Sequence, residues 1–172
     1  MKNVKWIFVV LLTSSLTSFI NKDKPTKGLT VGSKAPDFTI EVSPEKIASS
    51  FKLSDLRGKY VLINFWASYD AQSRMDNVLF SNVLLDKSLP VELVSISFDD
   101  YSSIYEETIR KDQIIGDYCF LAGNQRISDL FKKYQLKRGL TNFLLDERGV
   151  IVAKNLSVDQ LTTYFSPVKQ AA

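Results

Sequence analysis

The amino-acid sequence predicts a single α/β domain with three layers, in which helices flank both faces of a central mixed β-sheet. Stretches 60–66 and 91–98 are apolar and rich in β-branched residues, as is typical of parallel strands buried on both faces. Segments with helical spacing of apolar residues follow each of them. A Glu-Arg-Gly turn at 147–149 indicates a terminal hairpin. The 172 residues, 45% of them apolar, suffice for one core and no second domain.

The elements are expected in the order βαβαβαββα. Apolar residues recur every three or four positions in the segments that we expect to be helices, 73–87, 104–109 and 127–134. The shorter strands lie around Cys119 and at 142–145 and 150–153. A polar insertion, 43–50, precedes the first long strand.

The last helix is predicted from its first turn. Ser157-Val-Asp-Gln160 is the pattern of a capping box, in which the first and fourth side chains each accept a hydrogen bond from the other residue's backbone N–H. We expect this helix to bury its apolar residues, Val158, Leu161, Tyr164 and Phe165.

Residues 52–74 read Lys-Leu-Ser-Asp-Leu-Arg-Gly-Lys-Tyr-Val-Leu-Ile-Asn-Phe-Trp-Ala-Ser-Tyr-Asp-Ala-Gln-Ser-Arg. This stretch resembles the front half of thioredoxin-like thiol–disulfide oxidoreductases of the TlpA/ResA, or redoxin, type related to AhpC/TSA proteins. Residues 31–40 are similar to the Gly-x-x-Ala-Pro-Asp-Phe opening of that family, and Leu-Leu-Asp-Glu-Arg-Gly to its hairpin. The resemblance covers about residues 28–168 and implies a thioredoxin-like fold.

The chain departs from the family pattern at the reactive site. The family has Trp-Cys-x-x-Cys where this chain has Tyr69-Asp70-Ala-Gln-Ser73. A carboxylate cannot attack a disulfide and a serine hydroxyl cannot form one. The resemblance therefore implies no catalytic residue here. Asp70 is expected to cap the following helix rather than to act as a general acid or base, because a helix N-terminus favours an anion.

A second departure lies in the loop that carries a cis-proline in the family. Leu140, in the segment Gly139-Leu-Thr-Asn-Phe143, occupies the proline position. A cis bond before leucine would cost ~2.5–4 kcal/mol, so we expect a trans bond and a reshaped loop. With the cysteines absent, we expect the face around these positions to bind a protein or peptide through Trp66, Tyr69, Asp70, Ser73, Leu140 and Thr141. Trp66 and Phe143 could line this face, but for both of them an ordinary core position is the favoured interpretation.

The only cysteine, Cys119, excludes an intramolecular disulfide. Its apolar neighbours Tyr118 and Phe120 favour a buried structural residue, while the alternative is a lone reactive thiol in an antioxidant or oxidoreductase. The chain has no histidine, which excludes Ser-His and Cys-His catalysis and histidine-ligated metals. Asp99 and Asp100 could hold a cation but are more typical of a solvated loop. We expect no metal and no cofactor.

Residues 1–20 are expected to be a signal peptide or an N-terminal anchor, because Lys2 and Lys5 precede an apolar run at 6–12. Residues 21–29 form a polar linker, and 30–168 the thioredoxin-like domain. Without Lys2 and Lys5 the formal charge falls from +3 to +1, and no basic stripe indicates nucleic acid. The protein is expected to contact a membrane only through this N-terminal segment, and only if the segment is not cleaved.

The leading interpretation is a redox-inactive protein of the periplasm or cell envelope with a binding or structural role. Two alternatives stay open: an enzyme that works through Cys119, and an accessory subunit of an active redoxin.

Overall fold

The computed structural model describes residues 28–41, 50–87, 89–122 and 124–166. The expected signal or anchor segment lies outside these residues, as does most of the linker. None of the described helices is long and apolar enough to cross a membrane.

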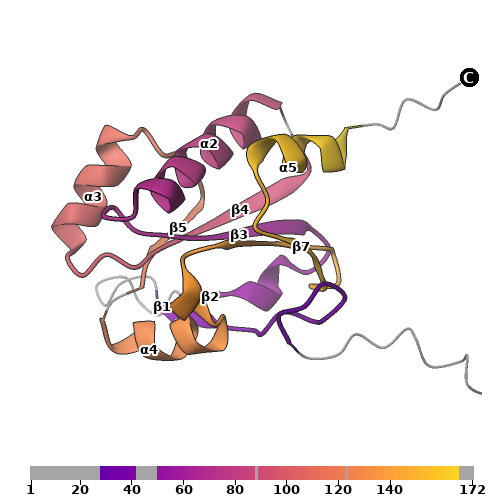
Figure 1. Ribbon diagram of the computed structural model, residues 1–172, viewed down its shortest axis with the longest axis horizontal. Coiled ribbons are helices and arrows are strands. Elements are labelled where there is room, and N and C mark those ends of the chain that lie inside the picture. Colours follow the sequence, from indigo (N-terminus) through magenta and orange to yellow (C-terminus); the bar gives the residue numbers. More distant parts are fainter. Residues whose placement is uncertain (1–27, 42–49, 88, 123, 167–172) are drawn as a thin grey trace, which may run out of the picture.

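A five-stranded mixed sheet forms the centre, with the strand order β5-β4-β3-β6-β7 (Figure 1). The parallel strands are β3 (Tyr60–Trp66), β4 (Val91–Ser97) and β5 (Tyr118–Leu121). Antiparallel to β3 runs β6 (Asn142–Leu145), which pairs in turn with β7 (Ile151–Lys154). The predicted mixed sheet and the predicted order of its elements are confirmed.

Helices cover both faces of the sheet, as the three-layer prediction required. One face carries α2 (Ala71–Lys87) and α5 (Val158–Phe165), and the other carries α4 (Asn124–Lys133); α3 (Ser102–Lys111) flanks the edge near β4 and β5 (Figure 1). Two short 3₁₀ helices, η2 (Leu53–Leu56) and η3 (Leu136–Arg138), complete the layers.

Strand β3 divides its side chains between two cores because successive residues point to opposite faces. Val61, Ile63 and Phe65 enter the larger core beneath α4, where Phe65 meets the rings of Tyr134 and Phe143 at centroid distances of 4.9 and 6.2 Å. Leu62 enters the smaller core beneath α2 and α5. This alternation decides which of the two cores a side chain of β3 joins, and residues 61–67 are all buried.

A second, two-stranded sheet was not predicted. It consists of β1 (Thr39–Glu41) and β2 (Ser50–Lys52), which pair antiparallel. Ser50 belongs to β2, although the sequence placed it in a polar insertion whose other residues, 43–49, lie outside the described ones. Each strand has three residues and one buried side chain, Ile40 or Phe51, which is too little for a periodic pattern.

Helix α5 begins as predicted and packs differently. Ser157 Oγ accepts from Gln160 N at 3.3 Å, and Ser157 N donates to Gln160 Oε1 at 2.9 Å, so the capping box is confirmed. Leu161 is fully buried, whereas Tyr164 is exposed, contrary to the prediction. Tyr164 lies at the rim, with its ring 6.3 Å from that of Tyr60.

Candidate functional site

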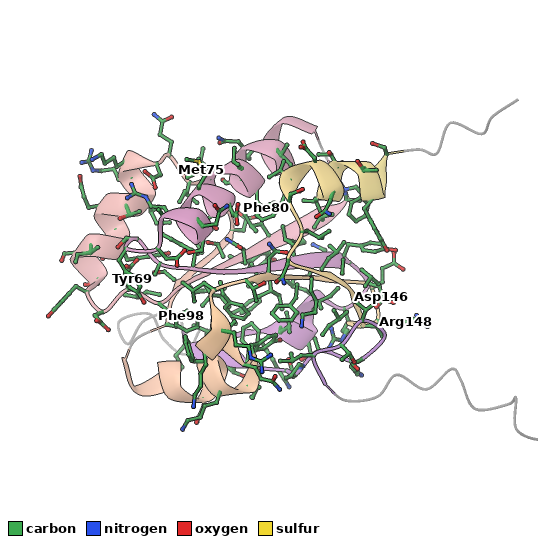
Figure 2. All side chains as sticks on the ribbon, in the orientation of Figure 1. Tyr69, Met75, Phe80, Phe98, Asp146 and Arg148 are labelled. Atoms are coloured by element: carbon green, nitrogen blue, oxygen red, sulfur yellow. The ribbon has the colours of Figure 1, made fainter. Side chains whose placement is uncertain are left out.

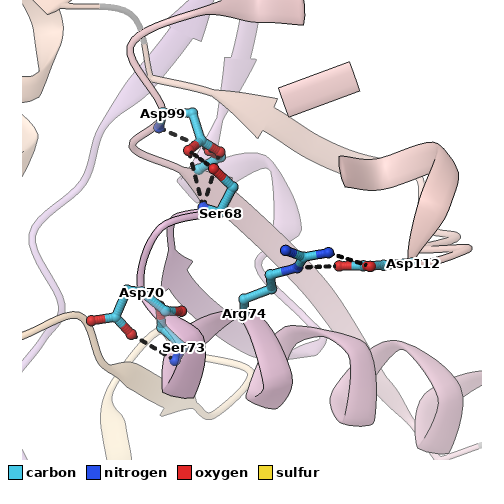
Figure 3. A network of polar contacts seen from close by, with 7 residues as sticks. Ser68, Asp70, Ser73, Arg74, Asp99 and Asp112 are labelled. Atoms are coloured by element: carbon cyan, nitrogen blue, oxygen red, sulfur yellow. Dashed lines mark hydrogen bonds and ion pairs between the residues drawn. The ribbon is translucent and has the colours of Figure 1, made fainter. Parts of the chain in front are cut away.

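The candidate site is built where β3 and β4 end and α2 begins. Asp70 directly precedes α2, and its Oδ1 accepts a hydrogen bond of 2.8 Å from the backbone N–H of Ser73 (Figure 3). Its own carbonyl accepts from Arg74 N at 3.0 Å, which is the first hydrogen bond of the helix. Asp70 is therefore the N-cap, as the sequence predicted, and its carboxylate satisfies one of the unpaired N–H groups of the first turn.

We expect Asp70→Ala to lower the free energy of unfolding by ~0.5–2 kcal/mol, because the Ser73 N–H loses its acceptor. Asp70→Asn should cost much less, since an amide oxygen also caps a helix. Urea unfolding followed by tryptophan fluorescence measures both. Ser73→Ala serves as the control and should cost less than Asp70→Ala, because it keeps the capped backbone N–H and removes only the 3.3 Å hydrogen bond from Ser73 Oγ to the Asp70 carbonyl. A more stable Asp70→Ala protein would indicate a strained functional carboxylate instead.

Asp99 lies just beyond β4 and fixes the loop between β3 and α2. Its carboxylate is only 2% exposed and accepts from Ser68 N at 3.0 Å, Ser68 Oγ at 2.5 Å and Ser97 Oγ at 2.7 Å (Figure 3). The expectation of a solvated acidic pair is thus wrong for Asp99, while its neighbour Asp100 is exposed. Two serines, 2 and 31 residues away, supply the donors, and no local sequence pattern links them.

Helix α2 is tied to the segment after α3 by an ion pair that the sequence did not reveal. Arg74 Nε and Nη2 donate to the two carboxylate oxygens of Asp112, each at 2.6 Å (Figure 3). These hydrogen bonds hold the pKa of Asp112 below its ordinary value and raise the pKa of Arg74. About two turns further along α2, Ser81 Oγ donates to the carbonyl of Ile115 at 3.0 Å. The first turns of α2 therefore have a fixed position.

Tyr69 projects from this fixed loop. Its side chain is 74% exposed and labelled in Figure 2 near the start of α2. Partial burial raises the pKa of Tyr69, and the charges of Asp99, Asp100 and Asp70 raise it further. The ring borders an open hollow of about 450 Å³, which we call the Tyr69 hollow. Its lining residues are Ser68, Tyr69, Ala71, Arg74, Met75, Val78 and Asp112.

Leu140 and Thr141 lie on the other side of β3. The Thr141 carbonyl accepts from Phe65 N at 3.1 Å, so the loop joins the sheet at the end of β3. No cis peptide bond occurs among the described residues, so the bond before Leu140 is trans as expected. Leu140 is half-buried against the larger core. Both residues line a second hollow of about 400 Å³ beside Arg138, separate from the Tyr69 hollow.

Two residues predicted for the binding surface are buried instead. Trp66 has no exposed area, and its Nε1 donates to Ser95 Oγ at 2.8 Å beneath α2. Both faces of β3 are covered at this end, so Trp66 is buried together with its neighbours Phe65 and Ala67. Ser73 is 4% exposed because its side chain points back to the Asp70 carbonyl, 3.3 Å away. The favoured interpretation of Trp66 and Phe143 as core residues is thus confirmed.

The Cys119 thiol has the surroundings of a structural residue. It is half-buried on β5, opposite Ser95 of β4. Burial raises the pKa of the thiol, a hydrogen bond with Ser95 opposes this, and the charge of Asp117 adds to the rise. A reactive cysteine needs the opposite, a cationic neighbourhood that favours the thiolate. The structure therefore disfavours the alternative of an enzyme that works through Cys119.

Two curated proteins are similar to this chain over most of its length. The thiol-disulfide oxidoreductase ResA of Oceanobacillus iheyensis is 26% identical, with 94% of this chain and 85% of that protein covered. The thioredoxin-like protein YneN of Bacillus subtilis is also 26% identical, with 86% of each chain covered.

Solved structures agree with the fold, and a family model agrees with the sequence. A thioredoxin-like protein from Parabacteroides distasonis is 35% identical with a TM-score of 0.68, and the match covers 84% of this chain and all of that one. The thioredoxin domain of a thiol-disulfide oxidoreductase from Bacteroides vulgatus is 27% identical with a TM-score of 0.66, over 80% and 96%. The AhpC/TSA family model matches residues 31–154. The chain therefore belongs to the AhpC/TSA family, as a thioredoxin-like member of the TlpA/ResA type.

Proposed function

We propose that this protein is an exported, redox-inactive member of its family that binds a protein or peptide at the face around Tyr69. The observation that carries the proposal is the helix cap. Asp70 stands at the position of the attacking cysteine, and its carboxylate is bonded to the N–H of Ser73, which stands at the position of the resolving cysteine. The helix terminus that would stabilise a thiolate in a relative here holds a carboxylate.

Loss of disulfide exchange follows from the chemistry of these two positions. Exchange needs a thiolate that attacks a disulfide sulfur, and a second thiol to release the mixed disulfide. Neither Asp70 nor Ser73 supplies sulfur, and Cys119 is half-buried with a raised pKa. The surrounding framework is nevertheless complete, since β3, α2 and the loop between them are tied together at Asp99 and at Arg74–Asp112.

A binding role is supported by the exposure and the rigidity of this face. Tyr69 presents a large aromatic ring beside a hollow whose lining includes Met75 and Val78. Aromatic residues next to a pocket are typical anchors of protein interfaces. Asp99 fixes the backbone of Ser68, the residue before Tyr69, so little conformational freedom remains to be lost on binding.

Export is supported by the N-terminal sequence. Lys2 and Lys5 precede the apolar run at 6–12, and small polar residues follow it at 13–15, which is the pattern of a signal peptide or anchor. The chain would then act in the periplasm or cell envelope.

Absence of redox activity is tested by insulin reduction with dithiothreitol as electron source. We expect the full chain to leave the rate at that of dithiothreitol alone, because exchange requires a thiolate at the helix terminus. Turnover comparable with that of an ordinary thioredoxin would contradict the proposal.

Binding is tested with reduced α-lactalbumin whose cysteines are blocked as amides, an unfolded chain that cannot exchange disulfides. We expect binding to the full chain, weakened at least about tenfold by Tyr69→Ala, the loss of an aromatic anchor. Tyr164→Ala is the matched control, since Tyr164 is an exposed tyrosine on α5 beside Tyr60, the first residue of β3. Equal binding by the parent and Tyr69→Ala, or no binding by the parent, would overturn the proposed face.

A further inference from the structure

We infer that the hollow beside Leu140 and Thr141 binds a carboxylate group, so that the partner proposed for the Tyr69 face also places an acidic side chain in this second hollow. This inference rests on the proposed function and names the chemistry of the partner. We call the site the Arg138 hollow. It is lined by three separate parts of the chain, with the residues Leu29, Tyr134, Gln135, Arg138, Gly139, Leu140, Thr141, Phe143, Lys154 and Asn155.

The charges that line the Arg138 hollow are all positive. Arg138 at the end of η3 and Lys154 at the end of β7 contribute two cations, and no aspartate or glutamate is among the lining residues. Among the described residues, no carboxylate forms an ion pair with either cation. The Tyr69 hollow differs, because its one cation, Arg74, is already neutralised by Asp112. An anion is therefore attracted more strongly to the Arg138 hollow than to the Tyr69 hollow.

The walls of the hollow hold these groups in place. Lys154 Nζ lies 5.3 Å from the centre of the Phe143 ring, so a cation–π contact restrains its chain. Thr141 Oγ1 donates to Asn155 Oδ1 and joins the loop to the residue after β7. Tyr134 and Phe143, each 1% exposed, form an aromatic floor. The site is thus composed of cations and neutral polar groups above an apolar base.

The backbone around the hollow adopts an uncommon conformation. Gln135 and Asn155 both have φ of 52°, in the left-handed region that residues other than glycine seldom adopt. The described chain has three such residues, and two of them line this one hollow. A residue keeps this conformation only where the surrounding structure holds it there. Such residues cluster at active sites and ligand-binding sites. These residues set the shape of the rim on both sides of Arg138.

A carboxylate is the anion that fits these observations. A guanidinium presents two parallel N–H donors to a carboxylate, and a lysine adds a point charge. Leu140 and Thr141 line this hollow, and the sequence predicts that both contact a protein segment together with Tyr69. Aspartate and glutamate are the anions that an unmodified protein segment carries.

The test uses the full chain and two short extended peptides of serine, valine and phenylalanine, one with glutamate and one with glutamine at the same alternate positions. Calorimetric titration should show the glutamate peptide binding about tenfold more tightly. The variant with Arg138→Gln and Lys154→Gln should bind both peptides alike. A control with Lys111→Gln and Lys132→Gln removes the same charge from exposed positions on α3 and α4 and should keep the preference.

Other outcomes separate this inference from the proposed function. Equal binding of the two peptides to the parent overturns the carboxylate site and leaves the proposed function standing. The same holds if the control variant loses the preference as fully as the Arg138 variant. If neither peptide binds, N-acetylglutamate is titrated while the amide signals of Thr141 and Asn155 are followed by NMR. Shifts in the parent that the Arg138 variant lacks support a site for a free carboxylate and overturn the peptide role, whereas no shift overturns both.

Discussion

Asp99→Ala is expected to lower the free energy of unfolding by about 3 kcal/mol, because hydrogen bonds to a charged group contribute ~1.5–3 kcal/mol each. The Asp99 carboxylate is buried and accepts from Ser68 N, Ser68 Oγ and Ser97 Oγ. Its removal leaves these donors without their acceptor in a place that water hardly reaches. Urea unfolding measures the loss, and Asp99→Asn should fall between the parent and the alanine variant.

The neighbouring residue supplies the control for this prediction. Asp100 is exposed, so Asp100→Ala should change stability by less than about 0.5 kcal/mol. If Asp99→Ala also stayed within that limit, the carboxylate would contribute no net stability, and the rigidity argued for Tyr69 would lose its basis. Weaker peptide binding by Asp99→Ala at a temperature where the variant stays folded would link the network to the binding face.

The second large effect is a gain of activity. Asp70→Cys with Ser73→Cys, made in a Cys119→Ala background, is expected to form an intramolecular disulfide and to show measurable but poor insulin reduction. The first new thiol would sit at the N-terminus of α2, where the pKa of a cysteine falls below its free value of ~8.5. Activity should stay poor because Leu140 replaces the family's proline, and Leu140→Pro should raise it further.

This reconstruction also tests the alignment of residues. Asp70→Cys alone is the control, since one thiol cannot form an intramolecular disulfide. Thiol counting after mild oxidation distinguishes the two variants. If the double-cysteine variant kept two free thiols, residues 70 and 73 would not occupy the paired positions of the family, and the assignment of this site would have to be abandoned.

Local patterns predicted the parts of this structure that depend on neighbouring residues. Strand β3 has the predicted bounds because a parallel strand buried on both faces is apolar throughout. The Asp70 cap and the Ser157 box were predicted because each joins residues three apart.

The rest of the site depends on contacts across the fold. Arg74 and Asp112 are 38 residues apart, and Ser68 and Asp99 are 31 apart, so neither pair leaves a trace in the local sequence. Trp66 shows a different difficulty, because it is adjacent in sequence to the exposed loop and yet faces inward at the end of a pleated strand. The sequence therefore predicted where in the chain the site lies. Which of the residues there expose their side chains depends on how the chain folds.

The ion pair between Arg74 and Asp112 has a consequence for how the protein responds to acid. The pKa of Asp112 is lowered, so the stabilisation from this pair is present above the ordinary aspartate pKa and is lost only as the pH falls through the lowered value. The pKa of Arg74 is raised, so alkali removes its charge still later. The chain also lacks histidine, whose ordinary pKa lies between pH 5 and 8. The ion pair therefore keeps both of its charges across the pH range in which a histidine would titrate, and acidification within that range does not release α2 from Asp112.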